Sequence, residues 1–67
     1  MELYLLSIDE KAKNITIELN KQKVNVKYWG GKTSGHQEYK WKHDWEGSKK
    51  ELEELANFID EVLWNYV

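Results

Sequence analysis

The chain has 67 residues, which is room for one small domain, and we predict a single domain over residues 1–67. Hydrophobic residues make up 40% and charged residues 33%, proportions typical of a folded domain and not of a disordered chain. The absence of cysteine excludes disulfides and thiolate metal sites, so either an aromatic core of four Trp, four Tyr and one Phe or self-association must support so short a chain.

The first predicted element is a strand at residues 3–8 (LYLLSI), an apolar run. Its side chains are apolar on both faces, so we expect this strand to be central or covered. The run is too short for a signal peptide or a membrane span. We therefore expect a cytoplasmic protein without a membrane partner.

Two further strands follow, each with alternating polarity. In residues 15–19 (ITIEL) isoleucine and leucine alternate with Thr16 and Glu18, and in residues 23–29 (KVNVKYW) valine and tyrosine alternate with outward lysine, asparagine and Trp29. The letters NKQ between the two runs predict a tight turn. One face of each strand is therefore expected to be buried and the other solvated.

The remainder of the chain predicts a fourth strand and a helix. Residues 36–45 (HQEYKWKHDW) alternate again, with aromatic residues and His43 on one face and charged residues on the other. After Gly47 the period changes, and residues 48–67 predict an amphipathic helix that begins with a Ser48–Glu51 capping box. The predicted apolar stripe of this helix consists of Leu52, Leu55, Ala56, Ile59, Val62, Leu63 and Tyr66. We predict an α+β fold (ββββα), a four-stranded antiparallel β-meander followed by one C-terminal amphipathic α-helix packed on one face.

Apolar residues outside the helical stripe predict self-association. Trp64 lies about a third of a turn away from the stripe and Phe58 lies at its edge. A helix that is apolar beyond one stripe usually packs against two surfaces. We therefore expect a homodimer with contacts through Phe58, Trp64 and Val67. The alternative is that Trp64 lies flat on its own helix or on the end of a strand.

The glycine-rich segment at residues 28–35 (YWGGKTSG) contains Gly-Lys-Thr, the last three letters of a phosphate-binding Walker loop. Val26 stands where that motif needs its first glycine, and a strand is expected to follow instead of a helix. We interpret the segment as a hairpin connection in which Gly30, Gly31 and Gly35 supply positive φ angles.

Candidates for catalysis and metal binding are few. His36 and His43 are the only imidazoles, and without cysteine they do not complete the three or four ligands of a zinc site. No histidine–acid pair is placed near Ser7 or Ser34, and Ser48 is assigned to the helix cap. We predict no enzymatic activity, no cofactor and no metal.

Charge is distributed unevenly along the chain. Residues 21–43 hold six lysines against a single glutamate, a local charge of +5, whereas residues 48–67 sum to −3. Lysines follow a phosphate backbone and an exposed aromatic ring stacks on bases, so this basic hairpin predicts contact with single-stranded nucleic acid. Arginine is absent, which argues against reading of the base sequence. The candidate nucleic-acid-binding residues are Lys23, Lys27, Trp29, Lys32, Lys40 and Lys42.

Other interpretations of these residues stay open. Outward lysines also keep strand edges from aggregating, which requires no ligand. Alternatively, the chain is a protein–protein interaction or inhibitor module that uses exposed Trp29 and Trp64 with the acidic C-terminal helix, and that helix would serve as a nucleic-acid mimic. The nucleic-acid prediction requires Trp29 and the outward lysines to share one face, and a bulge near Gly30 would separate them.

The order of four strands and one helix, with the segment VNVKYW (residues 24–29) before a glycine loop, is similar to that of the PC4-like family of single-strand-binding transcriptional cofactors. The resemblance implies a dimer formed through the helices and a single strand held on curved sheets. This chain departs from the family's pattern in its tryptophan-rich fourth strand and in its lack of a basic N-terminal arm and of arginine.

Overall fold

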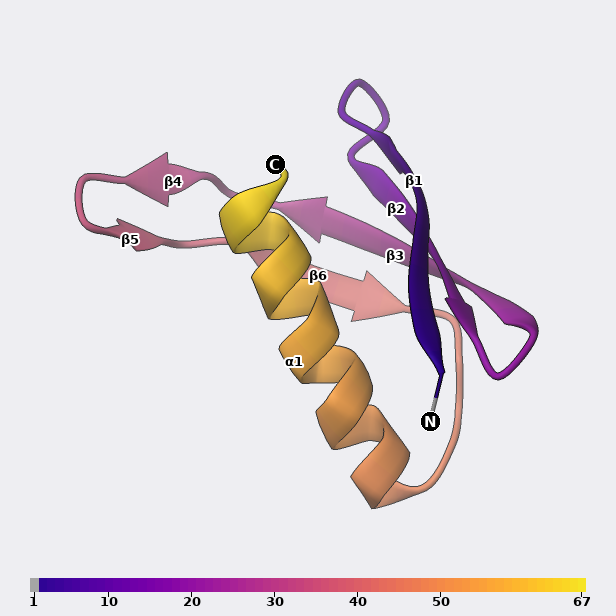
Figure 1. Cartoon of the computed structure of the whole chain (residues 1–67). Helices are drawn as coiled ribbons and strands as arrows, with labels where there is room; N and C mark the ends of the chain where they lie inside the picture. Colours follow the sequence, from indigo (N-terminus) through magenta and orange to yellow (C-terminus); the bar gives the residue numbers. More distant parts are fainter. Residues whose placement is uncertain (1) are drawn as a thin grey trace.

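Four of the strands form one antiparallel sheet, and a helix crosses a single face of it (Figure 1). The computed structural model describes residues 2–67, with residues 36 and 37 described by their backbone alone. The elements are β1 (Leu3–Asp9), β2 (Asn14–Leu19), β3 (Gln22–Trp29), β4 (Lys32–Thr33), β5 (His36–Gln37), β6 (Lys40–His43) and α1 (Lys49–Asn65). The sheet order is β1-β2-β3-β6, which confirms the predicted α+β class and the meander.

Short turns fix the register of the first three strands. Between β2 and β3 only Asn20 and Lys21 are unpaired, and both have positive φ, 48° and 68°, as a two-residue type I′ hairpin requires. Between β1 and β2 the carboxylate of Asp9 accepts hydrogen bonds from the backbone N–H groups of Lys11 and Ala12, each at 3.1 Å. These local bonds stabilise the turn without tertiary help.

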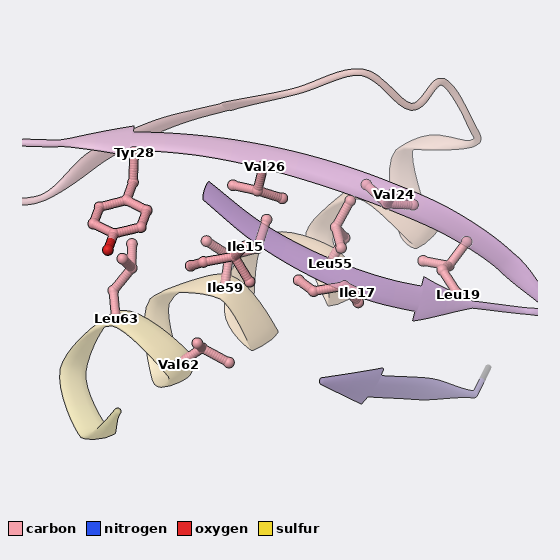
Figure 2. Close-up of a cluster of buried hydrophobic side chains, with 10 residues drawn as sticks. All are labelled: Ile15, Ile17, Leu19, Val24, Val26, Tyr28, Leu55, Ile59, Val62 and Leu63. Atoms are coloured by element: carbon pink, nitrogen blue, oxygen red, sulfur yellow. The ribbon is translucent and has the colours of Figure 1, made fainter. Parts of the chain in front are cut away.

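The core lies between α1 and the face of the sheet that the alternating pattern predicted to be buried. Figure 2 shows the four buried helix residues lying against β2 and β3. Tyr28 closes one end of the core, with its ring edge-on to that of Tyr39 at a centroid distance of 5.6 Å. Burial, and secondarily the negative charge of Glu10, raises the pKa of the Tyr28 phenol. The buried residues are Ile15, Ile17, Leu19, Val24, Val26, Tyr28, Leu55, Ile59, Val62 and Leu63.

The helix begins as its sequence predicts and ends earlier than its apolar stripe suggests. The hydroxyl of Ser48 accepts from the backbone N–H of Glu51 at 3.2 Å, and the Glu51 carboxylate accepts from the Ser48 N–H at 3.3 Å, so the capping box is confirmed. Tyr66, predicted to lie on the apolar stripe, is 66% exposed. It is the C-cap residue, with φ −118°, and its side chain therefore no longer follows the helical rotation.

The prediction that the first strand is central or covered is wrong, because β1 lies at an edge of the sheet and pairs only with β2. The register shifts between Leu5 and Ser7, which is the mark of a β-bulge. Tyr4 and Leu6 are about half exposed, at 52% and 46%. Apolar residues on both faces therefore indicate here an edge strand with an uncovered outer face.

The predicted fourth strand at residues 36–45 is in fact two strands. Gly30 ends β3 with a φ of 99°, and the backbone N–H of Glu38 donates to the carbonyl of Gly31 at 2.7 Å. The segment beyond that contact forms a separate ribbon of β4 and β5 (Figure 1), and β6 returns to the main sheet at Lys40. Gly30 and Gly35 have the expected positive φ, whereas Gly31 does not lie in the left-handed region.

Candidate functional site

The candidate site is the face of the sheet opposite α1, which we call the open face. Residues directly opposite each other on antiparallel strands project from the same face. The alternating burial of β3 places Val24, Val26 and Tyr28 in the core, and the residues between them on the open face. The main residues of the open face are Asn14, Thr16, Glu18, Lys23, Asn25, Lys27, Trp29, Lys40 and Lys42.

The register brings four of the predicted binding residues together. Trp29 lies directly opposite Lys40, and Lys27 lies directly opposite Lys42. The pairing between β3 and β6 continues without a shift up to Trp29, so Gly30 does not separate these side chains. The two pairs are two residues apart along each strand, or about 7 Å. We call Lys27, Trp29, Lys40 and Lys42 the tryptophan–lysine cluster. Its indole is 47% exposed.

The other two predicted lysines lie apart from this cluster. Lys23 is on the same face but at the far end of β3, opposite Glu18 on β2, so it forms a cross-strand pair of opposite charge. Lys32 begins the β4–β5 ribbon, and its ammonium group donates a hydrogen bond to the carbonyl oxygen of Val67, beyond the end of the helix. The ammonium of Lys32 is therefore used within the fold and does not join the open face.

A hollow of about 330 Å³ lies beside the cluster, lined by Asn14, Asn25, Lys27, Lys42, His43 and Asp44. Asp44 and Asn25 form a clamp that extends the ladder between β6 and β3. The Asp44 carboxylate accepts from the Asn25 backbone N–H at 3.0 Å and from its side-chain amide at 3.3 Å, and the Asp44 N–H donates to the Asn25 carbonyl at 3.3 Å. The hydrogen bond from the Asn25 backbone lowers the pKa of Asp44.

Asn14 is a site residue that the sequence interpretation missed, because the predicted strand began only at Ile15. It is the first residue of β2 and lies directly opposite Lys27, so Asn14, Lys27 and Lys42 form one row across three strands. Its side-chain oxygen is buried without a hydrogen-bond partner. Extending the alternation of Thr16 and Glu18 back by one period would have placed Asn14 on this face.

Trp41 and Trp45 form hydrogen bonds within the fold and are not part of the open face. The indole N–H groups of Trp41 and Trp45 donate to side chains of Asp60 and Gln22, both at 3.2 Å, so β6 is joined to the helix and the segment after β6 is joined to β3. His43 is a half-buried residue whose Nδ1 accepts from the Trp45 backbone N–H at 3.3 Å. It packs beside Trp41, as the sequence predicted.

The residues predicted for self-association differ in their exposure. Phe58 and Val67 are partly buried and pack against the chain's own core, whereas Trp64 is 48% exposed. A homodimer through the helix stays a prediction, as does a cytoplasmic location.

Within residues 2–67, no group of three or more His, Asp or Glu side chains is placed to hold a metal ion, and the side chain of His36 lies outside what is described. In that same part of the chain, no helix has both the length and the apolar character to cross a membrane. Comparison with protein-family models, with curated proteins and with solved structures finds no match for this chain.

Proposed function

We propose that this protein is a non-enzymatic binding module that contacts single-stranded nucleic acid through the tryptophan–lysine cluster. The observation that carries the proposal is the pairing of Trp29 with Lys40 beside Lys27 with Lys42, on a face that no helix covers. An exposed indole offers a stacking surface worth about 1–3 kcal/mol per base, and neighbouring ammonium groups neutralise phosphates. Both contacts tolerate any base.

The composition supports binding without sequence readout. Every one of the ten basic residues is a lysine, which binds phosphate as a point charge and lacks the planar fork that recognises guanine. Three lysines in the cluster imply about three phosphate contacts, and hence a slope of about −2 for the logarithm of affinity against the logarithm of salt concentration. Because the net charge of the chain is −2, attraction of a nucleic acid is expected only at the lysine-rich open face.

The test uses matched tryptophan variants and a fluorescein-labelled dT oligonucleotide, with binding followed by anisotropy at low and moderate salt. Trp29→Leu is expected to weaken binding about 5- to 150-fold, the equivalent of one lost stack. Trp64→Leu removes an indole of nearly equal exposure, 48% against 47%, from the helix and is expected to leave the affinity unchanged. Equal effects of the two variants would contradict the proposal.

Charge reversal supplies the second arm of the test. Lys27→Glu combined with Lys40→Glu is expected to abolish measurable binding, whereas Lys49→Glu combined with Lys50→Glu, the same two changes in the first turn of α1, is expected to leave it intact. If wild-type protein shows no binding at low salt while circular dichroism confirms that it is folded, nucleic acid is ruled out. The two half-exposed tryptophans would then favour a protein partner, because tryptophan is typical of interface hot spots.

A further inference from the structure

The row of Asn14, Lys27 and Lys42 contains an unfavourable electrostatic contact. Lys27 and Lys42 lie directly opposite each other on β3 and β6, and like charges in that relation destabilise a sheet. The opposite end of β3 shows the contrasting arrangement, because Lys23 there faces Glu18. Nothing in the fold of the described residues offers Lys27 and Lys42 a hydrogen bond or ion pair.

The carboxylate of Asp44, which lines the same hollow, already accepts hydrogen bonds within the fold. Both oxygens of Asp44 accept hydrogen bonds from Asn25, at 3.0 and 3.3 Å, so they are held toward β3 as part of the ladder. Asp44 therefore reduces the positive charge of the hollow, but it does not pair with either ammonium group. With two lysines and one carboxylate, the lining remains positive.

Asn14 lies in the row between Lys27 and Asp9, its direct partner on β1, and the Asp9 carboxylate is held by the N–H groups of its own turn. The side-chain oxygen of Asn14 is buried and has no hydrogen-bond partner. Because that oxygen is shielded from the hollow, it is not a ligand for an anion there, and Asn14 contributes only as a lining residue. An anion between Lys27 and Lys42 would therefore offset the repulsion between the two ammonium groups.

We propose that the hollow holds one phosphate group, bound by Lys27 and Lys42. A hollow of about 330 Å³ is much larger than one oxyanion, which favours a phosphate with sugar atoms attached to it. The inference rests on the proposed function and specifies it. A base of the nucleic acid that carries this phosphate would then reach Trp29, which lies two residues from Lys27 along β3. Free phosphate shares this chemistry, so the experiment separates the two sources.

The experiment compares Lys42→Thr with Lys23→Thr, which remove one lysine each from the open face and introduce a good strand former. Thermal unfolding is followed at low salt, with sodium phosphate against sodium chloride at matched ionic strength. For the wild type, phosphate at about five times its dissociation constant is expected to raise Tm by about 4–8 °C. Without phosphate, Lys42→Thr is expected to be more stable than the wild type, because the repulsion is gone, and to show no response to phosphate.

Lys23→Thr is the matched control. It loses the pairing with Glu18, so its Tm is expected to fall slightly, and it is expected to keep the full response to phosphate. Amide ¹H–¹⁵N spectra of the wild type locate the site, because phosphate is expected to shift the signals of residues 14, 27 and 42. A lower Tm for Lys42→Thr, or an undiminished phosphate response in that variant, would overturn the inference.

The dT oligonucleotide separates this inference from the proposed function. Lys42→Thr is expected to weaken dT binding about tenfold, and Lys23→Thr much less. If Trp29→Leu abolishes dT binding while Lys42→Thr leaves it unchanged, the phosphate position is wrong and the proposed function stands. If dT does not bind but phosphate still shifts residues 14, 27 and 42, the phosphate site stands for free phosphate and the proposed function is wrong.

Discussion

The central strands β2 and β3 and the edge strands β1 and β6 are held by different forces. Leu5 and Ile17 are direct partners across β1 and β2, yet Ile17 is fully buried at 0% exposure while Leu5 is only partly buried. One helix is too narrow to cover four strands, and hollows remain between β1 and α1, lined by Leu5 and Phe58 among others. Burial therefore stabilises the centre, and the edges depend on specific hydrogen bonds.

Those hydrogen bonds differ between the two edges. At β1, Asn20 in the neighbouring turn exchanges two bonds with Glu2, its backbone N–H donating at 3.1 Å and its side-chain oxygen accepting at 3.2 Å. At β6 the Asn25–Asp44 clamp and the two indole N–H groups perform the same task. An edge built in this way is expected to open locally at a lower free energy than a centre built from many apolar contacts.

The largest expected loss of stability comes from a substitution in the cross-strand pair of Ile17 and Leu5, whose two members can be compared. Ile17→Ala leaves a cavity in the closed core and is expected to lower the free energy of unfolding by about 3 kcal/mol. Leu5→Ala, at a position already partly solvated, is expected to cost about half as much. Urea denaturation followed by circular dichroism measures both. Equal losses would show that β1 is as well covered as β2.

Gly30 provides the next test, at the point where β3 ends. A Cβ there would lie 2.5 Å from the Glu38 carbonyl oxygen, and the φ of 99° strains any other residue. Gly30→Ala is expected to cost about 2–3 kcal/mol and to accelerate amide hydrogen exchange in β6 more than in β1. Gly31→Ala, where a Cβ meets nothing within 4 Å, is the control and is expected to cost less than about 1 kcal/mol. Uniformly faster exchange would contradict a local effect.

The Asn25–Asp44 clamp predicts a pH dependence of the β6 edge. Because the folded pKa of Asp44 is lowered, the clamp contributes stability above the unfolded pKa of about 3.9, and this contribution is lost as the pH falls below that value. Asp44→Asn is therefore expected to be less stable than the wild type at pH 6, with the difference in Tm shrinking as the pH falls through the lowered folded pKa. Glu46→Gln is the neighbouring control. A difference in Tm that does not shrink as the pH falls would mean that the charge of Asp44 is not the cause.

The smallest expected effect is an increase in stability at the turn between the central strands β2 and β3. Lys21 occupies the left-handed region at a φ of 68°, where glycine is unstrained. Lys21→Gly is expected to stabilise the β2–β3 hairpin by about 0.5–1 kcal/mol, because an Asn-Gly pair is the preferred type I′ turn. Lys23→Gly, inside β3, is expected to destabilise by a similar amount. Urea denaturation measures the change in the free energy of unfolding for both variants. A decrease for Lys21→Gly would contradict the turn assignment.

Local patterns were sufficient to predict much of this fold. Strict alternation around Ile17 and Val26 identified the buried face of the central strands, and Ser48 with Glu51 identified the start of the helix, because both signals depend on near neighbours in the chain. Alternation does not identify which strand lies at an edge. The apolar residues of β1 were therefore misread as covered, although they lie beside hollows that α1 leaves open.

The candidate site was predicted in part, for a related reason. Alternation within β3 was enough to predict that Trp29 and Lys27 lie on the same face of the sheet. The register of β3 with β6, which brings Lys40 and Lys42 opposite these residues, depends on the segment between the two strands. The position of Lys32 depends on a residue 35 positions away, Val67, which no local pattern reveals. The same holds for the bond between Asn25 and Asp44, since nothing in the sequence marks a contact between a polar residue of β3 and one that follows β6.

The contact between Trp45 and Gly47 has a consequence for how this chain evolves. The Trp45 indole lies so close over Gly47 that any Cβ at position 47 would collide with the ring. Position 47 accepts a larger residue only if position 45 becomes smaller, and the bond from the indole to Gln22 would then be lost as well. Homologues of this protein should therefore vary at positions 22, 45 and 47 together, as a correlated group and not as independent sites.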